Sequence, residues 1–205
     1  MNLSSFYNTL ITNFSAADRI FDILDLKPII KNENNAKAIG KINGVVEFKD
    51  VTFSYDENTE VLKKINFKVN KGEKIALVGA TGAGKTTIVS LLSRFYDPTD
   101  GEVLVDGKDI KKVDLESLRS QMGIMLQDTF LFSSSIMENI RYGRLDATDE
   151  EVIKAAKAVN AHDFIMKLED GYDTDVNERG SRLSLGQRQL VSFARALLAN
   201  PRILI

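Results

Sequence analysis

The chain has 205 residues, with 27 lysines and arginines against 29 aspartates and glutamates, for a formal net charge of −2. That length allows one sizeable core, or one core with a satellite. The slightly acidic balance argues against a general nucleic-acid binder, which would carry a basic stripe. With no cysteine and a single histidine, His162, disulfides, thiolate metal sites and histidine clusters are excluded. No stretch reaches the ~20 apolar residues that a bilayer span needs.

The N-terminal segment carries the pattern of an amphipathic helix. Between Leu3 and Leu24, apolar residues recur at spacings of three and four, which places them on one helix face. Pro28 ends the pattern, and the polar stretch 31–44 is typical of a linker. The stripe must pack on something: its own domain's core, a partner, or a bundle near a membrane. We therefore divide the chain into a helix at 1–27, a linker at 28–44 and a globular region at 45–205.

The globular region opens with strand patterns and continues with helical ones. Apolar parity changes near Asp50 within 46–55, which predicts a strand with a bulge or bend. The run 103–105, followed by Asp106-Gly107, predicts a strand entering a tight turn. The apolar run 74–79 predicts a strand buried on both faces. Helices are expected after it, with Ile88, Leu91, Leu92 and Phe95 on one side, and at 150–159, 161–168 and 185–198.

The segment Gly79-Ala80-Thr81-Gly82-Ala83-Gly84-Lys85-Thr86 has two glycines four residues apart followed by Lys-Thr, between a predicted strand and a predicted helix. This is the pattern of a phosphate-binding loop. Glycines let backbone N–H groups curl around a polyphosphate at the positive end of a helix. Lys85 then reaches the β- and γ-phosphates, and the Thr86 hydroxyl helps to hold Mg²⁺. The loop alone suits a transporter ATPase, a kinase, a GTPase or a helicase equally.

A second motif, Arg182-Leu-Ser-Leu-Gly-Gln-Arg-Gln-Leu190, lies about a hundred residues downstream. Alone it predicts only a capped amphipathic helix. Together with the phosphate loop, it resembles the signature of the ATP-binding cassette (ABC) ATPases, Leu-Ser-Gly-Gly-Gln, with Leu185 at the third place. The resemblance implies that Ser184 and Gly186, with Gln187 beside them, contact the γ-phosphate of ATP held by a second ABC ATPase subunit in a homo- or heterodimer.

Further stretches resemble the exporter-type members of this family. The resemblance implies that Tyr55 stacks on adenine and that Gln127 completes the Mg²⁺ shell. The stretch 174–180, with Asn177 in place of the usual Gly, resembles a segment that contacts the cytosolic loops of the membrane domain. The implied catalytic residues are Lys85 and Gln127, and the implied Mg²⁺ ligands are Thr86 and Gln127. The full ATP-binding set adds Ala80, Thr81, Ala83 and Thr87 to the residues already named.

The family resemblance implies an α/β fold: a P-loop NTPase (ABC ATPase) core with an antiparallel β subdomain and a helical subdomain at about 129–195. It also implies that the helix at 1–27 is the cytosolic end of the last membrane helix. Residues 202–205 resemble the start of a strand that ends in Asp and Glu in the family, so we expect the domain to be incomplete at its C-terminus. The expectation is that these 205 residues bind nucleotide but hydrolyse it negligibly and, for lack of sheet partners, are marginally stable.

The leading hypothesis is the ATPase domain of an exporter at the cell membrane, on its cytoplasmic side, with ATP and Mg²⁺ as cofactors and the membrane domain of the same chain as a partner. A nucleotide-binding regulatory module that never hydrolyses is one alternative. A soluble ABC ATPase acting on nucleic acid or ribosomes is another, and the exporter-like stretches and the acidic balance argue against it. The transported substrate is not readable from these residues.

Overall fold

The computed structural model describes residues 2–56, 59–125 and 129–205. The chain divides into two units, residues 1–31 and 32–205. In the first, α1 runs from Leu3 to Leu24 as the apolar spacing predicts, and Asn2 caps it by accepting a hydrogen bond from the Ser4 N–H. None of its residues is buried. Among the described residues, no helix is long and apolar enough to cross a bilayer.

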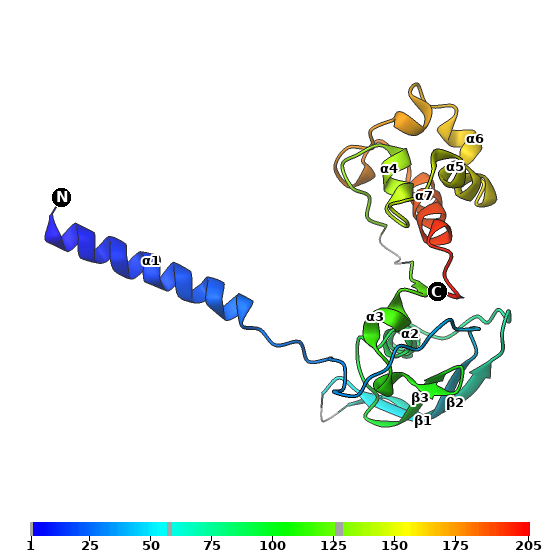
Figure 1. The fold of residues 1–205 in the computed structure, drawn as a ribbon, viewed down its shortest axis with the longest axis horizontal. Helices are drawn as coiled ribbons and strands as arrows, with labels where there is room; N and C mark the ends of the chain where they lie inside the picture. Colours follow the sequence, from blue (N-terminus) through cyan, green and yellow to red (C-terminus); the bar gives the residue numbers. More distant parts are fainter. Residues whose placement is uncertain (1, 57–58, 126–128) are drawn as a thin grey trace. The chain divides into compact units, whose positions relative to one another are not determined.

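The second unit begins with an antiparallel sheet in the order β2-β1-β3-β4 (Figure 1). Its strands are β1 (Val46–Ser54), β2 (Glu60–Val69), β3 (Asp100–Val105) and the short β4 (Lys108–Asp109). The predicted bulge is present, because the register shifts between Phe48 and Val51 and both residues are buried. Two hydrogen bonds close it: the Asp50 N–H donates to the Asn66 Oδ1 at 2.9 Å, and the Asn66 Nδ2 donates to the Asp50 Oδ1 at 2.7 Å.

Two helices and a parallel strand pair accompany this sheet. The helices are α2 (Lys85–Leu92) and α3 (Leu115–Arg119), with a 3-10 turn, η1 (Ile110–Lys112), before α3. The parallel pair is β5 (Met122–Gly123) with β6 (Ile203–Leu204). Residues from the sheet, α2 and α3 form one apolar core, which includes Phe48, Val51, Leu91 and Leu118.

The remaining helices gather around a second core (Figure 1). They are α4 (Ile136–Arg141), α5 (Asp149–Ala158), α6 (His162–Ile165) and α7 (Leu185–Leu198), with 3-10 turns η2 (Gly171–Asp173) and η3 (Glu178–Gly180). This core includes Leu131, Ile140, Val152 and Val191. An antiparallel β part and a helical part are thus both present, as expected from the resemblance.

Three local expectations are wrong. Residues 73–80 form no strand, and Val78 is 90% exposed, because no described strand pairs with this segment and an apolar run is buried on both faces only between partners. Phe95 lies beyond the end of α2 and is half-exposed, after Arg94 with φ of 52°. The helix expected at 161–168 is regular only over His162–Ile165, because i→i+3 bonds tighten its last turn.

Candidate nucleotide site

The phosphate-loop residues lead directly into α2. Gly84 is the N-cap of α2, with φ of 84°, and no side chain caps the helix. A Cβ at Gly84 would lie 2.6 Å from the Leu62 side chain, so both the backbone angle and the available space require glycine. Gly82 has the same φ of 84°, with open space where a Cβ would point. The loop therefore presents an uncapped helix N-terminus, which is a suitable place for an anion.

Lys85 lies over this loop. Its Nζ donates hydrogen bonds to the carbonyl oxygens of Gly79 and Ala80, both at 2.8 Å. Since an ammonium group has three donors, it can turn one toward a phosphate and keep loop contacts. Thr86, the next residue, is exposed and offers a hydroxyl oxygen, the hard donor type that Mg²⁺ prefers. One protein hydroxyl fits a cation that keeps several waters and takes its other ligands from phosphates.

Tyr55 and Thr87 come together from positions 32 residues apart. The Tyr55 hydroxyl lies 3.1 Å from the Thr87 Oγ1, and Thr87 is buried in the first turn of α2. The Tyr55 ring meets the rings of Phe53 and Tyr96 in T-shaped or edge contacts, at centroid distances of 4.8 and 5.1 Å. Tyr55 is nevertheless 53% exposed. The structure thus brings the aromatic residue chosen from sequence to the helix of the phosphate loop.

Ser184 caps α7 through a capping box. Its Oγ accepts a hydrogen bond from the Gln187 N–H at 3.3 Å, and the Gln187 side-chain oxygen accepts one from the Ser184 N–H at 2.9 Å. Because Oγ acts as an acceptor here, its own hydrogen can still be donated to a ligand. A Cβ at Gly186 would meet no atom within 4 Å, so the backbone is open to approach. Within the described ranges, no hydrogen bond or ion pair joins this helix tip to residues 79–87.

The stretch 174–180 pairs with the start of α4 and with the residues just before it. The Ile136 N–H donates to the Thr174 carbonyl and the Val176 N–H to the Ser134 carbonyl, both at 3.1 Å. Asn177 has φ of 57° and ψ of −172°, a backbone region that is nearly restricted to glycine. Asn177 therefore holds this turn under backbone strain.

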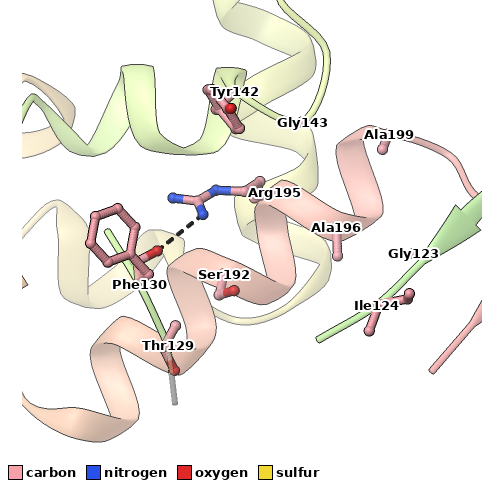
Figure 2. Close-up of a pocket in the computed structure, with 10 residues that line it drawn as sticks. All are labelled: Gly123, Ile124, Thr129, Phe130, Tyr142, Gly143, Ser192, Arg195, Ala196 and Ala199. Atoms are coloured by element: carbon pink, nitrogen blue, oxygen red, sulfur yellow. Dashed lines mark hydrogen bonds between the residues drawn. The ribbon is translucent and has the colours of Figure 1, made fainter. Parts of the chain in front are cut away.

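A cavity of about 310 Å³ lies between α7, the end of α4 and four residues of the preceding segment, Gly123, Ile124, Thr129 and Phe130 (Figure 2). Arg195 projects into it and donates to the carbonyls of Phe130 at 3.1 Å and Asn139 at 2.8 Å. Burial lowers the pKa of Arg195 from its usual value, an effect that Tyr142 opposes. Its guanidinium carbon is 5.7 Å from the centroids of both the Phe132 and Tyr142 rings.

No motif in the sequence indicates Arg195 as a site residue. The available signal was its position in α7, four residues after buried Val191 and three before buried Leu198, where an apolar residue would be expected. Gln127, in contrast, was singled out, but it lies outside the described residues. Its role as a Mg²⁺ ligand stays a prediction.

Residues 32–205 form a mixed α/β unit in which a glycine loop precedes a helix. The unit also has an antiparallel sheet and a helical core. This is the architecture of an ABC-type ATPase domain. The sequence profile described as "ABC transporter" matches residues 62–205. The chain belongs to the ABC transporter family. It is 54% identical over 203 residues to an uncharacterized ABC transporter ATP-binding protein, YknV, of Bacillus subtilis (strain 168), covering 99% of this chain and 34% of that protein.

Of two further similar proteins, one is named a flippase and the other an exporter. An ATP-dependent lipid A-core flippase of Syntrophus aciditrophicus (strain SB) is 46% identical over 99% of this chain and 34% of its own length. A solved structure of a bacterial Atm1-family ABC exporter with ATP bound is 43% identical, with a TM-score of 0.91, and the match covers 98% of this chain and 35% of that one. The chain thus spans about a third of the length of these relatives. It is the nucleotide-binding domain of an exporter-type ABC protein.

Proposed function

We propose that this domain binds Mg-ATP and, within the whole protein, hydrolyses it to drive export of a substrate across the cell membrane from the cytoplasmic side. The observation that carries the proposal is the uncapped start of α2, reached through Gly84 at φ of 84° and covered by the Lys85 ammonium. Backbone N–H groups and the helix dipole would hold the phosphates there, while Lys85 neutralises their charge. The catalytic residues of this proposal are Lys85 and Gln127.

Bound Mg²⁺ would supply charge neutralisation at the β- and γ-phosphates, with Thr86 and Gln127 as its ligands. Tyr55 would stack on the base. Residues 79–87 hold the triphosphate in place, which is most of what a protein contributes to phosphoryl transfer. That the 205 residues alone hydrolyse ATP negligibly stays a prediction, which a phosphate-release assay tests.

We further propose that Ser184, Gly186 and Gln187 complete the site of a second ABC ATPase subunit. Two features support this: the free hydroxyl hydrogen of the capping serine and the open space at Gly186. The helix N-terminus adds a favourable field for a γ-phosphate. The second subunit can be a copy of this chain or a different chain. In either case the start of α7 on one subunit would face the nucleotide site of the other.

For the membrane domain of the same chain, we propose contact with the stretch 174–180 and with the cavity into which Arg195 projects. The cavity wall carries Phe130 and Tyr142, which are 52% and 57% exposed. Hydrogen bonds between residues 134–136 and 174–176 join the stretch to the start of α4, and the residues after α4 line the cavity. Exposed aromatic residues in one patch are typical of protein interfaces. The helix α1, whose apolar residues are exposed, would continue into that membrane domain.

The test uses the full-length protein that carries this domain, purified in detergent or reconstituted in vesicles. Isothermal titration with Mg-ATP and a phosphate-release assay are run on the wild type, on Lys85→Ala and on a matched control, Lys63→Ala. Lys63 is exposed and forms a surface ion pair with Glu60, at 3.7 Å. We expect Lys85→Ala to lose ATP binding and turnover, while Lys63→Ala retains both. Equal ATP affinity in the two lysine variants would refute the proposed site.

A further inference from the structure

Three contacts fix the orientation of the Tyr55 ring. Two of the contacts are with the aromatic rings of Phe53 and Tyr96. Phe53 is 3% exposed, and its ring centroid lies 5.5 Å from that of Tyr96. The third is the hydrogen bond between the Tyr55 hydroxyl and Thr87. Two edge contacts hold the position of a ring only loosely, whereas a hydroxyl anchored to a buried partner fixes its direction. The ring keeps about half of its surface open.

Thr87 is well suited to be that anchor. It is 4% exposed and sits in the first turn of α2, two residues after Lys85, so its position is set by the same helix that begins at the phosphate loop. A hydrogen bond from Tyr55 to this residue therefore ties the ring to the loop itself. Any ligand held by the loop would meet the ring at a fixed distance and angle.

We infer that Thr87 is a positioning residue for base recognition: through the Tyr55 hydroxyl it holds the aromatic ring in register with the phosphate loop. The inference rests on the proposed function, since it takes Tyr55 as the residue that stacks on the base. It assigns to Thr87 a role in selecting a nucleoside triphosphate over a bare triphosphate. Stacking by a ring already in place avoids the loss of side-chain freedom on binding.

The test compares two probes, Mg-ATP and Mg-tripolyphosphate, by isothermal titration with the full-length protein. Tripolyphosphate has no base, so its affinity reports the loop alone. Tyr55→Phe removes the hydroxyl and keeps the ring, and Thr87→Val removes the other partner with nearly the same shape. Loss of one hydrogen bond corresponds to roughly a 2- to 10-fold change in affinity. We expect Tyr55→Phe to lower the affinity for Mg-ATP by that factor and to leave the affinity for Mg-tripolyphosphate unchanged.

Thr87→Val should weaken ATP more than tripolyphosphate, and Tyr55→Phe should add nothing further in the double variant, because the bond is already gone. Thr87→Ser keeps the hydroxyl and should restore the wild-type ratio of the two affinities. Tyr96→Phe is the matched control: it also removes a tyrosine hydroxyl from the three-ring cluster, and it should not change the ratio. Thermal melts without ligand check that each variant folds.

Several outcomes would overturn the inference. If the effects of Tyr55→Phe and Thr87→Val on ATP affinity add fully, the two residues act independently. If Thr87→Val weakens both probes equally, Thr87 acts on phosphate and not through the ring. An unchanged ATP affinity in Tyr55→Phe also refutes it. Failure of the wild type to bind either probe would instead refute the proposed function, so the two failures are distinct.

Discussion

Replacing Gly143 with alanine should destabilise the helical part of the domain. The residue follows α4, and a Cβ there would lie 2.1 Å from the backbone carbonyl oxygen of Arg195 in α7. Because an ordinary contact needs 3.4 Å or more, the two backbones would have to separate by about 1.3 Å. No side-chain rotation relieves a clash with a backbone carbonyl. Overpacking of this kind costs about 1–3 kcal/mol, which is a large part of the ~5–15 kcal/mol stability of an ordinary domain.

The assay is urea unfolding of the purified chain, followed by circular dichroism, with Gly186→Ala as the matched control. A Cβ at Gly186 meets no atom within 4 Å, and alanine is favoured over glycine in a helix by up to about 1 kcal/mol. We expect Gly143→Ala to lower the unfolding midpoint and Gly186→Ala to leave it unchanged or raise it. The close approach of α4 to α7 would be refuted if both variants shifted the midpoint equally, or if neither did.

Three further predictions concern the α7 tip, the strained turn and a helix cap. Ser184→Asp should keep the stability of α7, because Asp is an equally good N-cap. It should abolish ATP turnover of the full-length protein, because a carboxylate repels a γ-phosphate. Retained turnover would show that Ser184 is not part of the site. Asn177→Gly should raise the free energy of unfolding by about 1 kcal/mol, since relief of ~1–3 kcal/mol of strain exceeds the entropy that glycine adds; a lower midpoint in urea would contradict this. The pKa of Asp114 is lowered chiefly by its hydrogen bond from the Ser117 backbone, so its contribution to stability is present above the unfolded pKa near 3.9 and is lost as pH falls through the lower folded value. Melting temperatures between pH 5 and 2 should therefore depend less on pH in Asp114→Asn, and identical slopes would refute the assignment.

The sequence predicts elements best where pattern and capping agree. Helix α7 spans the expected residues 185–198, because Ser184 and Gln187 form a capping box at the start of an apolar stripe. Helix α1 likewise begins at a capping Asn2 and ends before Pro28. The bulge at Asp50 is visible as a change of parity, since alternation along a strand reports directly which face is buried.

Other features depend on partners that no local pattern encodes. The apolar run 74–79 carries the composition of a buried strand, but burial on both faces comes only from neighbouring strands. The Tyr55–Thr87 hydrogen bond joins residues 32 positions apart, and neither residue type signals the other. The role of Arg195 could not be predicted, because an arginine within the apolar stripe of a helix shows only that the stripe is broken at that position. Its partners are backbone carbonyls, which no residue type in the sequence indicates.

The irregular course of residues 73–80 has a consequence for how tightly nucleotide is held. Residues 73–78 lead into Gly79, and no strand that the structure describes pairs with them. Glu73, Lys74, Ile75 and Leu77 line a groove of about 690 Å³ beside α2 and β6. If only a fraction of the molecules hold the phosphate loop in the shape that binds ATP, the measured ATP affinity is the affinity of that shape multiplied by this fraction. Any contact that fixed Ile75 and Leu77 in the competent shape would therefore tighten ATP binding without touching a phosphate. By reciprocity, bound ATP would favour the ordered segment to the same extent, so the order of residues 73–78 and nucleotide binding are linked equilibria.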